Sequence, residues 1–226
     1  MNDIGKSALA EFIATFALIF IGASAGVLSG QVAGVLGVAL AHGLVLAIMV
    51  SITAHISGGH VNPAVTIGVW VGGKISSAKA LVYIGSQVAG GIFGALMVRA
   101  VMPGLVYSAA HGGAPALGAR TPTGTGVLVE AILTFFLVFA VYGTAVDKRG
   151  PLAKTAGLTI GLVLTFDILA GAPLTGAAMN PARAFGPELA AGFWTDWWVY
   201  WVGPILGGVI AAGVYSLAFL REGEDE

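Results

Sequence analysis

The residues most suggestive of chemistry are two Asn-Pro-Ala triplets, Asn62-Pro63-Ala64 and Asn180-Pro181-Ala182, the second followed directly by Arg183. Asn is a favoured N-cap and Pro is favoured at the first helical position, so each triplet predicts the start of a helix. A helix N-terminus carries about +0.5 charge, which at about 4 Å and an effective dielectric constant near 20 repels a monovalent cation by about 2 kcal/mol. Two such termini with Arg183 would exclude cations on the order of 10³-fold. Small neutral molecules escape this penalty because they carry no net charge.

The composition requires a membrane protein. Of 226 residues, 57% are hydrophobic and 9% are charged, and the mean hydropathy is +0.93. These values exclude a soluble globular domain. The net charge of −1 gives no reason to expect nucleic acid as a partner. With no Cys and no metal-ligand spacing among the four His, we expect no disulfide, no metal and no cofactor.

Apolar stretches long enough to cross the bilayer occur six times, at about 8–28, 35–54, 79–102, 126–146, 153–171 and 195–220. An even number places both termini on one side. That side also carries seven of the 10 Lys and Arg residues, which makes it cytoplasmic by the positive-inside rule: Lys6, Lys74, Lys79, Lys148, Arg149, Lys154 and Arg221. The first stretch resembles a cleaved export signal, but Glu11 inside it favours a retained span.

The chain contains an internal repeat with an offset of about 118 positions, which aligns residues 56–64 with 174–182 and Glu11 with Glu130. Each half holds three spans, so the second half must enter the membrane from the opposite side. We therefore predict an all-α membrane protein with one channel domain, 1–226. Its inverted repeats cover about 4–102 and 123–220, and a loop at 103–125 joins them.

Each half also contains a segment too short to span, at about 62–71 and 180–189, which we predict to be a re-entrant half-helix. The non-helical backbone before each one is tolerated at membrane depth only if it is buried or lines a wet cavity. Two such segments entering from opposite faces would meet at the midplane and outline a narrow channel. We expect the following residues to line it through their backbone: Gly58, Gly59, His60, Val61, Gly176, Ala178 and Met179.

Residues 55–66 and 180–187, with both triplets at mirrored positions, closely resemble the aquaporin (major intrinsic protein) family, and the resemblance covers essentially the whole chain. It implies the aquaporin fold and a passive, proton-excluding water channel, with Asn62 and Asn180 directing their amides at passing water. It also implies a homotetramer in the lipid bilayer with one pore per subunit, and no enzyme activity.

The resemblance further implies a selectivity constriction built from His42, Ile168, Ala177 and Arg183. Strongly water-selective members have Phe and His at the first two positions. His42 and Ile168 instead resemble the plant tonoplast intrinsic subgroup, which passes ammonia, urea or hydrogen peroxide along with water. Glycerol facilitators form the alternative branch, but they carry Asp after the Arg, where this chain has Ala184.

Other polar residues have competing interpretations. Glu11 and Glu130 could form an ion pathway, but their matched positions favour accepting N–H bonds from the loops before the half-helices, as in the family. His55 and His60 could gate the pore by protonation, although ordinary loop roles are favoured. Asp167 is expected to be an exposed or paired helix-end carboxylate. Glu188 departs from the family pattern and has no explanation.

Two further expectations concern the membrane. An outer aromatic belt is predicted at the start of the last span, from Trp194, Trp197, Trp198, Tyr200 and Trp201. A prokaryotic plasma membrane is the expected location.

Two other functions remain open. A secondary transporter also fits inverted repeats with broken helices, and a nonconducting membrane scaffold is a third interpretation. The absence of an acidic partner for Arg183 argues against transport coupled to an ion.

Overall fold

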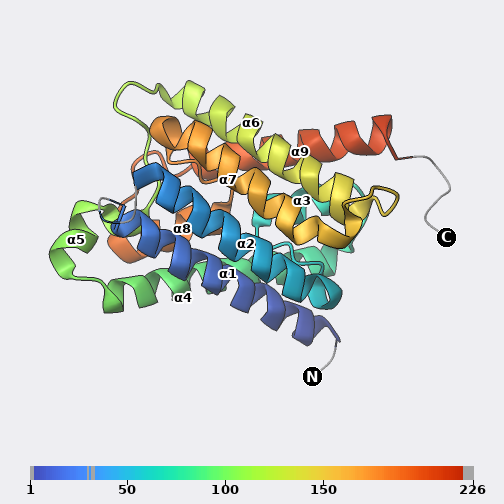
Figure 1. The fold of residues 1–226 in the computed structure, drawn as a ribbon, viewed down its shortest axis with the longest axis horizontal. Helices are drawn as coiled ribbons and strands as arrows, with labels where there is room; N and C mark the ends of the chain where they lie inside the picture. Colours follow the sequence, from blue (N-terminus) through green and yellow to red (C-terminus); the bar gives the residue numbers. More distant parts are fainter. Residues whose placement is uncertain (1–2, 30, 32–33, 221–226) are drawn as a thin grey trace.

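A computed structural model describes residues 3–29, 31 and 34–220; Arg221, counted above among the cytoplasmic charges, lies outside them. Described residues fold into helices and connecting turns (Figure 1). Six long helices are apolar enough to cross a membrane. The helices are α1 (Asp3–Val27), α2 (Gly34–Ser57), α3 (Pro63–Val71), α4 (Ser77–Val101), α5 (Gly104–Ala109), α6 (Thr123–Val141), α7 (Ala156–Thr175), α8 (Pro181–Ala191) and α9 (Val199–Ala218).

The six expected spans are confirmed, with boundaries that shift by a few residues. The fourth span continues from α6 through a π-helical turn, Tyr142–Val146, and a short 3-10 turn, Ala153–Thr155, leads into α7. The connection expected at 103–125 contains the short helix α5 and a 3-10 turn at His111–Gly113. The short helices α3 and α8 occupy opposite halves of the bundle (Figure 1).

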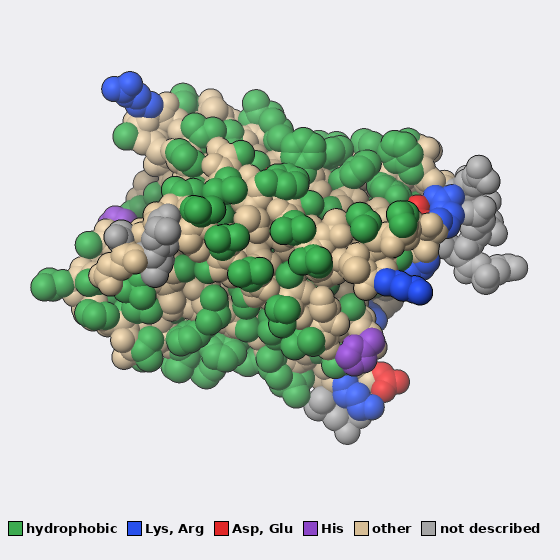
Figure 2. All heavy atoms as spheres, in the orientation of Figure 1, with side chains coloured by type: hydrophobic (Ala, Val, Ile, Leu, Met, Phe, Trp, Pro, Cys, Tyr) green, Lys and Arg blue, Asp and Glu red, His purple; other side chains and the backbone are tan. Residues whose placement is uncertain are grey.

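The outer surface of the bundle suits a lipid environment. Large hydrophobic side chains on the flanks are exposed, among them Leu44, Ile48, Leu81 and Leu162, at 57%, 60%, 69% and 56%. Figure 2 shows such side chains spread along the flank, while most Lys and Arg side chains gather at the end where α1 begins and α9 ends. Water would penalise this apolar surface, whereas hydrocarbon covers it at no cost.

Close helix packing through glycine holds the bundle together, both within each half and between the halves. The most extensive helix pairs are α1 with α4, α6 with α9, and α2 with α7. At the crossing of α2 and α7, a Cβ on Gly161 would lie 2.6 Å from Ala47 Cβ and would also collide with the Gly43 carbonyl oxygen. Such contacts let the backbones approach closely, which is how helices associate in membranes without a hydrophobic driving force between them.

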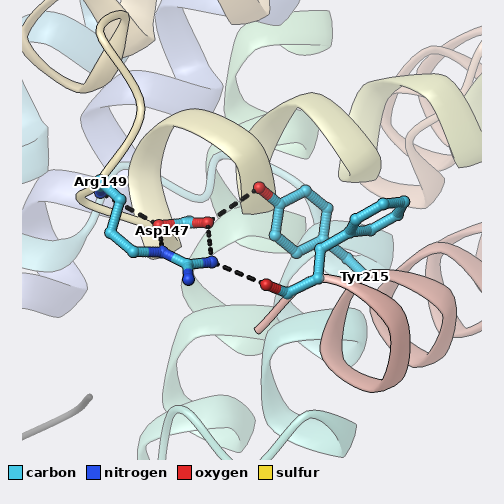
Figure 3. Close-up of polar contacts among 4 residues, drawn as sticks. Asp147, Arg149 and Tyr215 are labelled. Atoms are coloured by element: carbon cyan, nitrogen blue, oxygen red, sulfur yellow. Dashed lines mark hydrogen bonds and ion pairs between the residues drawn. The ribbon is translucent and has the colours of Figure 1, made fainter. Parts of the chain in front are cut away.

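A polar clasp fixes the connection between α6 and α7 to the end of α9 (Figure 3). Arg149 donates from Nε to Asp147 Oδ1 at 2.9 Å and from Nη2 to Asp147 Oδ2 at 2.7 Å. The same Nη2 donates to the carbonyl oxygen of Phe219 at 2.7 Å, and the Tyr215 hydroxyl donates to Asp147 Oδ2 at 3.1 Å. The Arg149 guanidinium holds the pKa of the Asp147 carboxyl well below its usual value.

Candidate pore

The two half-helices α3 and α8 are N-capped by the Asn residues of the triplets, Asn62 and Asn180. Asn62 Oδ1 accepts from the Ala64 N–H at 2.8 Å, and Asn180 Oδ1 accepts from the Ala182 and Arg183 N–H groups at 3.0 and 3.2 Å. These are N-cap bonds, which fix the carboxamide and satisfy N–H groups that lack helical partners. Pro63 and Pro181 follow at the first helical position.

The same Asn side chains join the two half-helices end to end. Asn62 Nδ2 donates to the Met179 carbonyl oxygen at 2.8 Å, and Asn180 Nδ2 donates to the Val61 carbonyl oxygen at 2.9 Å. Each bond uses one of the two N–H groups of a carboxamide. Asn62 and Asn180 both line the central cavity. The second N–H group of each side chain can therefore donate to a molecule in the cavity.

Ala64 and Ala182 complete the triplets at places where the half-helices press against long helices. Both residues are fully buried. A Cβ on Gly208 of α9 would lie 2.8 Å from the Ala64 carbonyl oxygen, and one on Gly91 of α4 would lie 2.6 Å from the Ala182 carbonyl oxygen. The small residues on both sides therefore allow each half-helix to sit deep in the bundle.

The loops before the half-helices are held in strained conformations. Val61 and Met179 have φ of 57° and 53°, a region that side-chain-bearing residues rarely occupy and that costs about 1–3 kcal/mol. Glu11 Oε2 accepts from the Val61 N–H at 2.7 Å, and Glu130 Oε2 accepts from the Met179 N–H at 2.7 Å. Because the opposite Asn holds each carbonyl group, both polar groups of each strained residue are fixed.

Each carboxylate binds a second loop N–H through its other oxygen. Glu11 Oε1 accepts from His60 at 2.9 Å, and Glu130 Oε1 accepts from Ala178 at 2.9 Å. Glu11 and Glu130 are fully buried. The pair of bonds turns successive N–H groups of each loop toward a carboxylate on a long helix. The carbonyl groups of Val61 and Met179 then point toward the opposite Asn side chains, which bind them, an arrangement that a regular helix would not allow.

Several residues that support these loops were not predicted from the sequence. Ser57 and Thr175 donate to the two carboxylates at 2.6 and 2.7 Å, and Gln87 donates to Glu11 at 2.8 Å. The hydroxyls of Tyr83 and Tyr200 donate to the carbonyl oxygens of Ser57 and Thr175 at 2.6 and 2.9 Å. The sequence feature that could have identified them is the presence of polar side chains within or beside apolar spans. Four of these residues lie at matched positions of the repeat, Ser57 with Thr175 and Tyr83 with Tyr200.

A narrow central cavity runs along these loops, with about 20 Å³ open to the centres of water molecules. A space of this size admits water-sized molecules one at a time. Its polar wall comes from the loops and half-helices, and the opposite wall from apolar side chains. Besides the Asn pair, the lining residues are Leu18, His42, Leu46, Val50, Gly59, His60, Val65, Leu137, Val141, Ile160, Leu164, Ile168, Ala177, Ala178 and Arg183.

The residues expected at the pore wall are only partly gathered there. Gly59, His60 and Ala178 line the cavity. Gly176 instead lines an outer vestibule of about 470 Å³, which shares Arg183 with the central cavity. Gly58, Val61 and Met179 line neither space; the carbonyl groups of the last two bind the Asn side chains instead.

All four residues expected to form the constriction line the same cavity: His42 from α2, Ile168 from α7, Ala177 from the second loop and Arg183 from α8. His42 Nδ1 lies 2.9 Å from the Val38 carbonyl oxygen and therefore donates to it. Arg183 Nη1 donates to the Gly113 carbonyl oxygen at 3.0 Å. Arg183 is 7% exposed. Because it lines both the central cavity and the vestibule, its charge lies where the two spaces meet.

The structure corrects two expectations about acidic and aromatic residues. Asp167 is 1% exposed within α7, and its Oδ2 has no hydrogen-bond partner among the described residues, so it is neither exposed nor paired as expected. Tyr200 is fully buried and binds the second loop, so it does not belong to an outer belt. Trp194, Trp197 and Trp198 are 41–46% exposed but precede α9 rather than opening it, because α9 begins at Val199.

The histidines and Glu188 have ordinary or unexplained surroundings. His55 is exposed at the end of α2, and His60 Nδ1 lies 3.1 Å from Thr66 Oγ1. His111 stacks on Phe193 with ring centroids 4.2 Å apart. Both carboxylate oxygens of Glu188 are buried and have no hydrogen-bond partner in the described part of the chain, which nothing in the structure explains.

Residues 2–215 match the sequence model of the major intrinsic protein family. The chain belongs to that family. Among its relatives, aquaporin TIP4-4 of Zea mays is 45% identical, with 100% of this chain and 92% of the relative covered. Aquaporin TIP1-2 of Zea mays is 43% identical over 97% of this chain and 88% of the relative, and probable aquaporin TIP3-2 of Oryza sativa is 42% identical over 97% and 83%.

The solved aquaglyceroporin of Plasmodium falciparum is similar in fold, with a TM-score of 0.80 at 23% identity over 95% of this chain and 96% of that chain. The expected family, its TIP-like character and the expected fold are thus confirmed. The chain is an integral, multi-pass membrane protein and a channel rather than an enzyme. The three TIP aquaporins named above are plant proteins, so a prokaryotic plasma membrane receives no support from them.

Proposed function

We propose that this chain is a passive water pore that excludes protons and ions. The observation that carries the proposal is the meeting of two N-capped half-helices at one cavity, where Asn62 and Asn180 line the wall and Arg183 lies at the outer end. The names of the aquaporin relatives agree with it. Passage of water along this wall requires no conformational cycle, because the bound groups that line it are already in place.

Cation exclusion follows from the charges at the cavity. The N-termini of α3 and α8 each contribute about +0.5 charge, and Arg183 adds a full charge. None of the described residues that line the cavity is acidic, so no carboxylate offsets this field there. A cation also loses hydration that the apolar wall cannot replace, whereas a neutral water molecule exchanges hydrogen bonds with the polar wall.

Proton exclusion is attributed to the two Asn residues. Their Nδ2 groups lie at the junction of the half-helices, each fixed by an N-cap bond and a bond to the opposite loop. A water molecule that accepts a hydrogen bond from both Asn62 and Asn180 has both lone pairs occupied. Its hydrogen atoms then point outward, and the hydrogen-bonded chain along which a proton could hop is interrupted.

The constriction supports passage of ammonia, urea or hydrogen peroxide in addition to water. Ile168 offers no polar group, and Ala177 has a small side chain, which leaves His42 and Arg183 as the polar groups of the ring. Glycerol conduction is the alternative within the family, and Ala184 in place of Asp after Arg183 argues against it. A secondary transporter would need a site for a driving ion, which a lining without carboxylates does not offer.

The remaining proposals concern topology and assembly. We place both termini in the cytoplasm because six basic residues lie on their side: Lys6, Lys74, Lys79, Lys148, Arg149 and Lys154. The proposed unit is one channel domain with inverted repeats at about 4–102 and 123–220, which is supported by the equivalent bonds of the two loops. A homotetramer with one pore per subunit is proposed from family membership. No particular membrane is proposed.

Stopped-flow light scattering on proteoliposomes tests the function. Vesicles that contain the wild-type protein should shrink quickly when an impermeant osmolyte is added outside. They should not become leaky to protons, which a pH-sensitive dye inside the vesicles would report. Arg183→Ala should keep fast water flow but raise the leak of protons or cations. His42→Phe should lower urea and ammonia flux more than water flux. Water flow no faster than in empty vesicles would refute the proposed function.

A further inference from the structure

His42 is held in place from two sides. On one side its Nδ1 donates to the Val38 carbonyl oxygen one turn earlier on α2, at 2.9 Å. On the other side lies Gly22 of α1. A Cβ on Gly22 would fall 2.5 Å from Cδ2 and 2.7 Å from Cε1 of the His42 ring, and nearer still to Nε2. The three nearest atoms to that missing Cβ all belong to His42, so the ring occupies the space that a side chain at position 22 would fill.

The orientation of the ring follows from these atoms. Nε2 and its two ring neighbours form one edge of the imidazole, and this edge faces the backbone of α1 at Gly22. Nε2 is buried and has no hydrogen-bond partner among the described residues. Because Nδ1 carries the donated hydrogen, a neutral ring has its lone pair on Nε2. The lone pair on Nε2, with which His42 could accept a hydrogen bond, therefore points toward the backbone of α1 and not into the lumen.

Gly22 also lies on the side of α1 that faces the pore. Leu18, one turn earlier on the same face, lines the central cavity, and Gly26, one turn later, lines the outer vestibule. Between them, at the level of His42, α1 presents no side chain. The width of the constriction on this side thus depends on how deeply the imidazole can withdraw against the helix.

We infer that Gly22 is a specificity-determining residue that positions His42: its missing side chain lets the imidazole withdraw from the lumen and keeps the constriction wide. The inference rests on the proposed role of His42 in selectivity. In Gly22→Ala the methyl group and the ring cannot share the space. Since the Val38 bond anchors the ring on α2, the ring moves toward Ile168 and Arg183, narrowing the lumen and directing Nε2 into it.

The expected effect is a change in selectivity rather than a loss of the channel. Urea is larger than water, and a displacement of about one methyl group discriminates between molecules on the order of 10-fold or more. Urea flux of Gly22→Ala should therefore fall about 10-fold, while water flux falls much less. Ala is a better helix former than Gly, so α1 itself should not be weakened.

The experiment compares water and urea fluxes in proteoliposomes for wild type, Gly22→Ala, His42→Ala and the double variant. Gly85→Ala on α4 is the matched control, because a Cβ there meets nothing within 4 Å, and it should leave both fluxes unchanged. The inference expects Gly22→Ala to lower the ratio of urea to water flux in the wild-type background and to have little effect when His42 is Ala, since the ring that it displaces is gone.

The outcomes separate this inference from the proposed function. Two results would overturn the inference. Gly22→Ala could leave the ratio of urea to water flux unchanged, or it could lower this ratio by the same factor whether residue 42 is His or Ala. In either case Gly22 does not act through the ring. If His42→Ala itself changes no solute flux, the proposed constriction is wrong. If Gly22→Ala does not fold, the double variant must restore folding, because removal of the ring removes the collision; failure of both to fold refutes the inference.

Discussion

Replacing Glu130 by Gln tests whether buried carboxylates hold the strained loops. The Glu130 carboxylate accepts from the Thr175 hydroxyl at 2.7 Å and from the Ala178 and Met179 N–H groups at 2.9 and 2.7 Å. A carboxamide has one oxygen in place of two. Whichever way it is turned, its NH₂ group faces one of the two backbone N–H groups and leaves that group without an acceptor.

The size of the effect follows from these bonds. A buried N–H without an acceptor costs about 1–3 kcal/mol, and each remaining bond loses about 1 kcal/mol when its acceptor is no longer charged. The sum is about 3–5 kcal/mol, which for a chain of this size lowers the melting temperature by roughly 6–20 °C. Relief of a buried charge acts in the opposite direction, so a control must measure it separately.

Glu188→Gln is that control. Glu188 is as fully buried as Glu130, but its oxygens accept no hydrogen bond from the described residues. Its replacement by Gln therefore removes a buried carboxylate without breaking a hydrogen bond. Melting of the purified protein can be followed by intrinsic Trp fluorescence, and water flux by light scattering. Glu130→Gln should melt roughly 6–20 °C below Glu188→Gln and conduct less water. Equal melting temperatures would refute the role assigned to the Glu130 bonds.

Three further predictions address other parts of the molecule. Asp147→Asn should lower stability by about 1 kcal/mol. Because Arg149 lowers the pKa of Asp147, this difference should persist from pH 8 down to about the ordinary carboxyl value of 3.8 and disappear only below it; melting curves that converge between pH 7 and 5 would contradict the assignment. Gly161→Ala should cost about 1–3 kcal/mol by forcing α7 away from Gly43 and Ala47 of α2, whereas Gly85→Ala should not, as melting curves can show. Mercurial thiol reagents should leave water flux unchanged because the chain has no Cys; inhibition at low mercury concentration would count against the pore as described.

The sequence by itself determined the features that depend on local pattern or on repetition. Six apolar stretches gave the spans because each must cover the hydrocarbon thickness alone. Asn62 and Asn180 marked the starts of the half-helices, since capping is a property of a few adjacent residues. The matched positions of Glu11 and Glu130 related the two halves, although the bonds that these carboxylates accept were only inferred from the family.

Tertiary structure alone decided what depends on the approach of distant segments. No pattern near Gly22 shows that the His42 ring fills its missing side chain, because the two residues belong to different helices. Burial of Asp167 was likewise hidden, since its position along α7 says nothing about what packs against that face. Sequence patterns record which residues are neighbours along the chain, whereas the width of a pore is set by atoms that meet only after the helices have packed.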